Sequence, residues 1–362
     1  MKVLFVFYVP SGGVETLNRQ RRAALELEGI SAHFLYYEKR RELVNDHGAP
    51  VYITNEDADI KQIFDANNFD AAVVTSDFLS FARFRRLGFT GKLILESQGF
   101  GPKEVAYSQL ELAVPLVNNY ANGLLHPMTE HIAAIYRHFY PTTPTFGFDI
   151  CFDTDSFAYM AGTAAENPII AWVGRLEDNK NWREFLQIAH KMLTEYRQDL
   201  QFYMFHDPSL AAQSENDAFE QMLDSLQLRA HVSIFPDVPH TDMPYYFSLI
   251  GDSGGFLLST SKVESAGYAV IEAISCSCPV LTTDSDGVRR AVIHNQTGKY
   301  YDIGDPDSAL REAKELIVNI DQRTYIRENG LRHVKERFSY RSYASSFKQM
   351  LLDLGIQDTS NG

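Results

Sequence analysis

Two glutamates eight positions apart, Glu264 and Glu272, are the residues whose types and spacing most clearly suggest chemistry. The apolar run 255–261 before them predicts a buried parallel strand, and the apolar spacing after it predicts a helix over 266–277. Glu264 would then lie in the loop at the carboxyl end of a strand, where open α/β sheets bind ligands. Glu272 would lie inside the following helix. Carboxylates at such a place can accept hydrogen bonds from sugar or ribose hydroxyls.

Groups that suit an anion are predicted beside these carboxylates. The amides of Ala266, Gly267 and Tyr268 would open the helix, and a helix N-terminus favours an anion such as a diphosphate. Arg175 and Lys180 follow the first strand of the second half of the chain. An Arg fork and a Lys point charge can hold a diphosphate and stabilise charge on a leaving group. The alternative interpretation is an ordinary solvated surface.

Two further loops are candidate ligand contacts. Ser11, Gly12 and Gly13 follow the first strand, and paired glycines there let backbone approach a ligand closely. They do not form Gly-x-Gly-x-x-Gly, so no dinucleotide fingerprint is present. Val238 lies in a loop after a strand, where main chain can face a nucleobase. A tight turn and an unspecialised loop are the alternatives.

The run from Ser261 to Ala273, followed by Cys278-Pro-Val-Leu281, closely resembles the E-x7-E signature of the retaining glycosyltransferases of family 4, within glycosyl transferases group 1. The resemblance extends from Ser11-Gly-Gly-Val-Glu15 to Phe338-Ser-Tyr340. It implies the α/β GT-B fold, in which two Rossmann-like doubly wound domains face each other across a cleft. It also implies a donor on the second domain and an acceptor on the first.

The resemblance also implies roles for individual residues. Glu264 would act closest to the sugar, as a catalytic residue. Gln98 occupies the position where the family usually carries a histidine, which makes it the second expected catalytic residue, an orienting amide. The expected donor-binding residues are Gly12, Gly13, Arg175, Lys180, Val238, Glu264, Ala266, Gly267, Tyr268 and Glu272. Two departures from the family pattern, His206-Asp-Pro208 and Asp286-Gly-Val-Arg-Arg290, leave the donor's identity open.

The expected function is therefore transfer of a sugar, with retention, from a nucleotide-diphospho-sugar to a hydroxyl acceptor. A UDP- or GDP-sugar is the favoured donor, and the acceptor is not specified by the sequence. No cofactor or metal is expected, because the two Asp-x-Asp pairs at 153–155 and 284–286 are interpreted as accidental. The alternatives are a sugar-nucleotide epimerase and a degenerate sugar-nucleotide binder without turnover.

Composition narrows the possible partners and compartment. The 362 residues include 45% hydrophobic and 22% charged residues, as in globular proteins, and carry a formal charge of −14, which argues against nucleic acid. Three cysteines without a Cys-x-x-Cys pair favour the cytoplasm. The apolar run Val3–Val9 is interpreted as the first strand rather than a signal segment, and no stretch approaches the length of a membrane span.

Two successive α/β alternations predict two domains and a closing helix. We expect an acceptor-side domain over 1–155, a nucleotide-sugar-binding domain over 165–337, and a helix over 338–355 that returns to the first domain. Peripheral membrane contact is only weakly supported, and solvated surface is the favoured interpretation of three basic clusters in the first domain: Arg19/Arg21/Arg22, Lys39/Arg40/Arg41 and Arg83/Arg85/Arg86.

Overall fold

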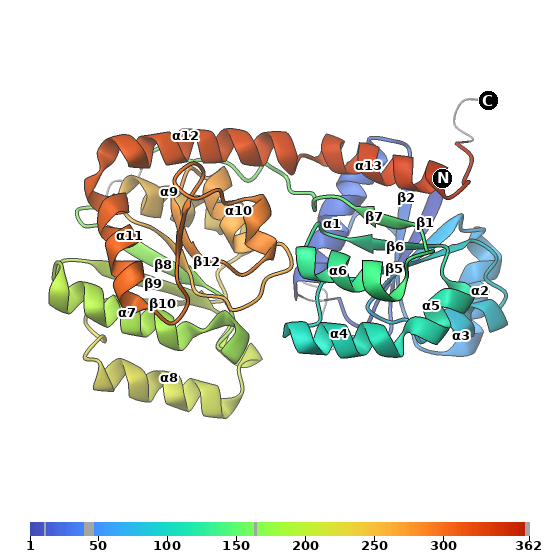
Figure 1. Ribbon diagram of the computed structural model, residues 1–362, viewed down its shortest axis with the longest axis horizontal. Coiled ribbons are helices and arrows are strands. Elements are labelled where there is room, and N and C mark those ends of the chain that lie inside the picture. Colours follow the sequence, from blue (N-terminus) through green and yellow to red (C-terminus); the bar gives the residue numbers. More distant parts are fainter. Residues whose placement is uncertain (11, 40–46, 163–164, 359–362) are drawn as a thin grey trace. The chain divides into compact units, whose positions relative to one another are not determined.

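The structure is a computed structural model that describes residues 1–10, 12–39, 47–162 and 165–358. The chain forms two compact units, drawn in Figure 1. The first comprises Met1–Asp153 together with Arg337–Gly362, and the second comprises Thr154–Glu336. Ser11, Arg40 and Arg41, which the sequence placed in a ligand loop and a basic cluster, lie outside the described residues.

The first unit is built on a seven-stranded parallel sheet with the order β3-β2-β1-β4-β5-β6-β7. Because the chain changes direction across the sheet between β1 and β4, this is the topological switch point, where open sheets bind ligands at their carboxyl edge. The strands are β1 (Lys2–Phe7), β2 (Ser31–Tyr36), β3 (Val51–Ile53), β4 (Ala71–Thr75), β5 (Lys92–Glu96), β6 (Gly123–His126) and β7 (Thr145–Gly147). The helices are α1 (Gly12–Glu26), α2 (Asp57–Asn67), α3 (Ser80–Arg86), α4 (Lys103–Leu112), α5 (Val114–Tyr120), α6 (Glu130–Phe139) and α13 (Tyr340–Asp353).

The second unit is built on a six-stranded parallel sheet with the order β10-β9-β8-β11-β12-β13. Its strands are β8 (Ile169–Val173), β9 (Gln201–His206), β10 (Val232–Pro236), β11 (Phe256–Ser259), β12 (Val280–Thr283) and β13 (Lys299–Tyr301). Its α-helices are α7 (Trp182–Glu195), α8 (Gln213–Ser225), α9 (Met243–Asp252), α10 (Tyr268–Ser275), α11 (Pro306–Val318) and α12 (Ile320–Arg337). Short 3-10 turns are η1 (Asp178–Lys180), η2 (Pro208–Leu210), η3 (His240–Asp242) and η4 (Gly287–Arg290). These two sheets confirm the predicted pair of Rossmann-like domains.

The strands form where short apolar runs can be buried on both faces. All five residues of β4 are buried, as expected for a parallel strand covered by helices on each side. In the second unit the two tryptophans of the chain, Trp172 and Trp182, anchor the core between the sheet and α7. Both cores hold the carboxyl ends of their strands in place, and the candidate site residues lie at those ends.

The closing helix α13 packs on α1 within the first unit. Ser339 caps it by accepting a hydrogen bond from the amide of Ser342, and the Phe347 ring lies 5.7 Å from that of Phe5.

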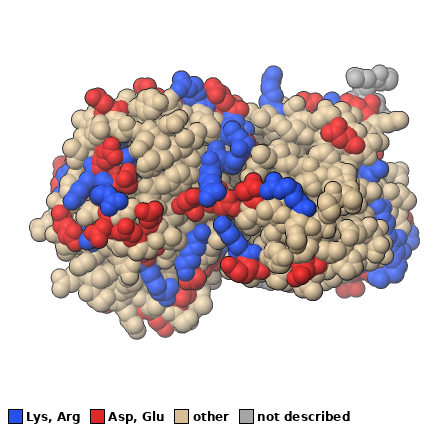
Figure 2. All heavy atoms as spheres, viewed as in Figure 1, with Lys and Arg blue, Asp and Glu red and all other residues tan. Residues whose placement is uncertain are grey.

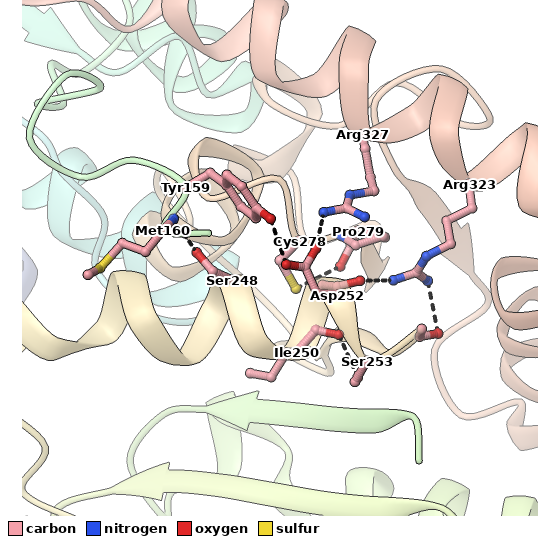
Figure 3. A network of polar contacts seen from close by, with 12 residues as sticks. Tyr159, Met160, Ser248, Ile250, Asp252, Ser253, Cys278, Pro279, Arg323 and Arg327 are labelled. Carbon is pink, nitrogen blue, oxygen red and sulfur yellow. Dashed lines mark hydrogen bonds and ion pairs between the residues drawn. The ribbon is translucent and has the colours of Figure 1, made fainter. Parts of the chain in front are cut away.

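The residues that enter the second unit are fixed to it by polar contacts, as Figure 3 shows. There the Tyr159 hydroxyl donates to Asp252 Oδ2 at 2.7 Å, and Arg327 pairs with Asp252 Oδ1 at 2.7 Å.

The prediction that the basic clusters are solvated surface is wrong for Arg21. Its guanidinium is fully buried and donates two hydrogen bonds to the buried Glu96, at 2.7 and 3.1 Å. Arg21 follows Leu17 by one helical turn and precedes Leu25 by another, so it lies on the buried face of α1. Burial is possible because the carboxylate neutralises and hydrogen-bonds the cation.

The described surface carries both signs of charge. Figure 2 shows acidic and basic side chains interspersed over the face that it draws of each unit. No helix in the described part of the chain combines the length and apolar character that a membrane span requires.

Candidate active site

In the second unit, two loops at the carboxyl edge of the sheet are joined by one asparagine. Asn179, in the turn after β8, donates from Nδ2 to the carbonyl of Val263 at 3.0 Å, and its Oδ1 accepts from the Val263 amide at 3.2 Å. The Lys262 amide donates to the Asn179 carbonyl at 2.8 Å. The loop that carries Lys180 is thereby held against the loop that carries Glu264.

Lys180 and Glu264, 84 residues apart, form an ion pair across these loops. The Lys180 Nζ lies 2.5 Å from Glu264 Oε1, and both side chains remain partly exposed. Gly174, directly after β8, leaves room for the lysine, because a Cβ there would lie 3.2 Å from Lys180 Cγ and 3.0 Å from the Trp172 ring. A partly exposed lysine beside a carboxylate can exchange that partner for an incoming phosphate.

The backbone of Glu264 is fixed by the loop after β12. Its amide donates to the Ser285 carbonyl at 2.8 Å, and its carbonyl accepts from the Gly287 amide at 3.0 Å. Gly287 cannot carry a side chain here, since a Cβ would lie 2.4 Å from the Glu264 carbonyl oxygen. The segment that departs from the family pattern, Asp286-Gly287, therefore positions Glu264.

Helix α10 begins later than the sequence predicted. Gly267 is its N-cap, with a positive φ of 66° that favours glycine, and Tyr268 is its first residue. The prediction that Ala266 is helical is therefore wrong, since Ala266 lies in the loop. The N-terminus of this helix is therefore formed by Tyr268 and the residues that follow it.

Glu272 lies inside α10, as predicted, and its buried carboxylate meets a histidine that sequence reasoning missed. His240 Nε2 lies 2.8 Å from Glu272 Oε1. The His240 ring packs 4.9 Å from the ring of Phe157. Val238, a predicted donor contact, is half-buried two residues before His240. No local pattern joins His240 to Glu272, and only its place after strand β10 could have indicated it.

Arg175 is the predicted phosphate ligand least engaged with the other site residues. Its Nη2 lies 3.1 Å from Glu177 Oε1, and its side chain is 57% exposed. The structure thus joins Lys180 to Glu264 and leaves Arg175 at the surface, paired within its own loop.

In the first unit, Gln98 belongs to a network around the buried Glu96. The Gln98 Nε2 donates to Glu96 Oε1 at 2.9 Å, and the Thr75 hydroxyl donates to Glu96 Oε2 at 2.7 Å. Arg21 supplies two more donors. Because its amide nitrogen is committed to Glu96, Gln98 has its carbonyl oxygen left to accept a hydrogen bond from a hydroxyl.

The glycine pair after β1 lies inside a helix rather than in a loop before it. Helix α1 begins at Gly12, so Gly12 and Gly13 form its first turn. A Cβ built at Gly13 would meet nothing within 4 Å, which leaves open space beside this turn.

Asp284 is engaged with an arginine. The Arg289 guanidinium donates to both its oxygens, at 2.7 and 2.8 Å, and this contact holds the Arg289 pKa above its usual value. Across the described ranges, no group of three or more His, Cys, Asp or Glu side chains is arranged to hold a metal ion.

A known family model matches most of the second unit. Residues 160–333, which carry Lys180, His240, Glu264 and Glu272, match the family model described as "Glycosyl transferases group 1". The fold is GT-B. The structure superposes on sucrose-phosphate synthase from Thermosynechococcus elongatus with a TM-score of 0.83, 15% identity, and coverage of 98% of this chain and 99% of that one. It also superposes on the Anabaena protein HepE in complex with UDP-glucose, with a TM-score of 0.80, 16% identity, and coverage of 98% of this chain and 100% of that one.

Curated relatives match over shorter segments. N-acetyl-alpha-D-glucosaminyl L-malate synthase of Bacillus anthracis is 26% identical over 106 residues, covering 29% of this chain and 28% of that protein. The 2-deoxystreptamine N-acetyl-D-glucosaminyltransferase of Niallia circulans is 25% identical over 150 residues, covering 41% of this chain and 36% of that protein. These matches therefore span about a third of each relative's length.

Proposed function

We propose that the protein is a retaining glycosyltransferase that moves a sugar from a nucleotide-diphospho-sugar to a hydroxyl acceptor without a metal ion. The observation that carries the proposal is the Lys180–Glu264 pair at 2.5 Å, held by Asn179 in the loops that match the family model. A UDP- or GDP-sugar is the proposed donor. Its support is that HepE, which has a similar fold, was solved with UDP-glucose.

Each group has a proposed task. Lys180 exchanges Glu264 for the diphosphate and stabilises the charge that develops on the leaving group. Released from the lysine, Glu264 accepts hydrogen bonds from the sugar, while Glu272 accepts from ribose hydroxyls and is oriented by His240. Arg175, exposed at the surface, adds a second cation for the diphosphate. Gln98 orients the acceptor hydroxyl through its carbonyl oxygen, and the leaving phosphate takes the proton.

A thermal-shift screen of the full chain with UDP-, GDP-, ADP- and TDP-sugars tests the donor. A ligand at 100 times its dissociation constant stabilises a folded protein by about 2.7 kcal/mol. Glu272→Gln should diminish the shift, whereas Glu195→Gln, an exposed glutamate on α7 outside the site, should not. Absence of a shift with every nucleotide sugar would reject the proposal.

Turnover and its stereochemistry are tested by NMR on the product made from the donor that binds. We expect the product to retain the donor's anomeric configuration. We also expect that EDTA does not reduce the rate of transfer. Conversion of the donor sugar in the absence of any acceptor would instead indicate the epimerase. Binding without conversion across a panel of sugar acceptors would indicate a degenerate binder.

A further inference from the structure

A cavity of about 460 Å³ opens at the carboxyl edge of the first-unit sheet. Three of its lining residues follow neighbouring strands: Tyr8 follows β1, Tyr37 follows β2, and Asp77 follows β4. The cavity thus lies at the topological switch point, and its volume falls in the range of about 300–1,000 Å³ typical of small-molecule sites. We name it the Tyr8–Asp77 pocket; its lining also includes Tyr37, Glu38, Leu79, Ser80 and Arg83.

Two tyrosine rings form one corner of this pocket. The centroids of Tyr8 and Tyr37 lie 6.1 Å apart with an interplanar angle of 70°. Tyr8 is 43% exposed and Leu79 is 68% exposed, so apolar surface is open to an occupant. A sugar ring presents a C–H face that packs on aromatic carbon and hydroxyls that need polar partners. The pocket offers both kinds of contact.

The polar side of the pocket carries negative charge. The Asp77 side chain is buried and accepts a hydrogen bond from the Ser80 hydroxyl, which in turn lies 2.5 Å from the Tyr37 hydroxyl. Burial and the charge of Asp77 raise the pKa of Tyr8 to about 12, and the same two causes raise that of Tyr37. Both phenols therefore stay neutral, and Asp77 can accept hydrogen bonds from hydroxyl or ammonium groups.

The arginine in the wall is already committed to other groups. Arg83 Nε donates to Asp57 Oδ1 at 2.7 Å, and Nη1 donates to Asn55 Oδ1 at 2.6 Å. Its Nη2 donates to the Asn55 carbonyl. An incoming anion would have to break all three of these contacts and approach the Asp77 carboxylate, whereas at Lys180 it would break a single ion pair, so phosphate and carboxylate groups are disfavoured here.

We propose that the Tyr8–Asp77 pocket binds an uncharged or cationic polyol ring, a sugar or an aminocyclitol, and rejects rings that carry phosphate or carboxylate. The role of this pocket as the acceptor subsite rests on the proposed transferase function. Its binding of a polyol ring does not depend on that function. The contrast with the second unit is chemical. There a partly exposed lysine and a helix N-terminus suit a diphosphate, whereas here the residues available to a ligand suit hydroxyls and ammonium groups.

The test uses the full chain with methyl-labelled leucines, titrated with methyl glucoside, glucosamine, glucose 6-phosphate and glucuronate. Leu79 lies in the pocket wall, and Leu112 on α4, 66% exposed, is its matched control. We expect the neutral and amino rings to shift the Leu79 methyl signals and leave those of Leu112 unchanged. Their dissociation constants should be at least about tenfold below those of the two anions, a difference of about 1.4 kcal/mol.

Variants locate and explain the binding. Tyr8→Ala should raise the dissociation constant of methyl glucoside at least about fivefold, and Tyr325→Ala, an exposed tyrosine on α12, should leave it unchanged. Asp77→Asn should reduce the ratio of the dissociation constant of glucose 6-phosphate to that of methyl glucoside. Asp65→Asn, at an exposed aspartate on α2, should leave this ratio unchanged.

Equal or tighter binding of the anions, a Leu79 signal that no probe moves, or indifference to Tyr8→Ala would overturn the proposal. These results are independent of the nucleotide-sugar screen, so this pocket and the proposed donor site can fail separately.

Discussion

The charged pair Arg21–Glu96 in the first unit is buried, whereas the pair Lys180–Glu264 in the second unit stays partly exposed. Arg21 and Glu96 are fully enclosed and joined by two hydrogen bonds. Lys180 and Glu264 are joined by one contact and keep 24% and 15% of their side-chain surface exposed. A buried pair is too costly to open, while a partly exposed pair can exchange a partner for a ligand. The first arrangement suits a structural role, and the second forms the proposed diphosphate site.

Removal of one member of the buried pair should give the largest effect. Arg21→Met removes two hydrogen-bond donors from the buried Glu96 carboxyl and leaves those of Thr75 and Gln98, so we expect the first unit to lose about 3–5 kcal/mol of stability. Hydrogen exchange in residues 92–96 measures it. Tryptophan fluorescence should change less, because Trp172 and Trp182 both lie in the second unit.

The neighbouring Arg22 provides the control for this loss. Arg22 pairs with Glu26 on the exposed side of α1, so Arg22→Met should cost no more than about 1 kcal/mol. Equal losses from the two variants would contradict the distinction between buried and exposed pairs.

The sequence predicted the second-unit groups better than the first-unit network. Glu264 and Glu272 belong to one short pattern, and strand–loop–helix geometry brings Lys180 to the same edge. The Arg21–Glu96 pair joins residues 75 apart, and no local pattern announces such a contact. The placement of Arg21 between Leu17 and Leu25 on one helical face was the available signal, and the neighbouring Arg19 and Arg22 obscured it.

Elements that depend on tertiary packing were also missed. Strand β3 has only three residues, and its pairing with β2 requires the sheet to exist first. Helix α5 begins one residue before Pro115, a position that tolerates proline, whereas an isolated proline suggests a break. His240 lies 32 residues from Glu272 and meets it only because β10 and α10 share one edge of the unit.

Loss of the exchangeable lysine should give the next largest effect, on activity rather than stability. Lys180→Ala removes a preorganised cation, and we expect kcat/KM to fall by about 10²–10³-fold. Lys191→Ala is the control, since Lys191 pairs with Glu195 and Asp307 away from the site. Steady-state kinetics with the donor that binds decides the matter, and wild-type rates from Lys180→Ala would place the diphosphate elsewhere.

Gln98 belongs to the buried Glu96 network and is the proposed orienting residue for the acceptor, so we expect its loss to have an intermediate effect on transfer. Gln98→Ala removes an orienting hydrogen bond and should slow transfer by about 10–100-fold. Gln62→Ala, an exposed glutamine on α2, should not alter the rate. Because an amide does not titrate, we expect no kinetic pKa near 6.5 from this position. Transfer that appears only in Gln98→His would favour the degenerate binder instead.

The smallest effect concerns a feature that the two units share, a buried histidine at the end of a strand. Burial lowers the pKa of His126, at the end of β6, to about 4, with Glu130 opposing and Arg137 adding to the shift. Burial also lowers the pKa of His206, at the end of β9, where Asp207, Glu220 and Asp237 oppose the shift. The first unit should therefore be the more sensitive to acid.

The sign follows from proton uptake by the unfolded chain. Between pH 6.5 and about 4 the unfolded His126 binds a proton that the folded one does not, so its stabilising contribution is complete above pH 6.5 and declines as the pH falls toward 4. The free energy of unfolding should fall by no more than about 1.4 kcal/mol per pH unit as the pH drops through this range. Hydrogen exchange of β5 and β6 at several pH values measures it. His126→Leu should flatten the slope, while His138→Gln, on the exposed side of α6, should leave it. An unchanged slope in His126→Leu would show that other first-unit groups govern the acid response.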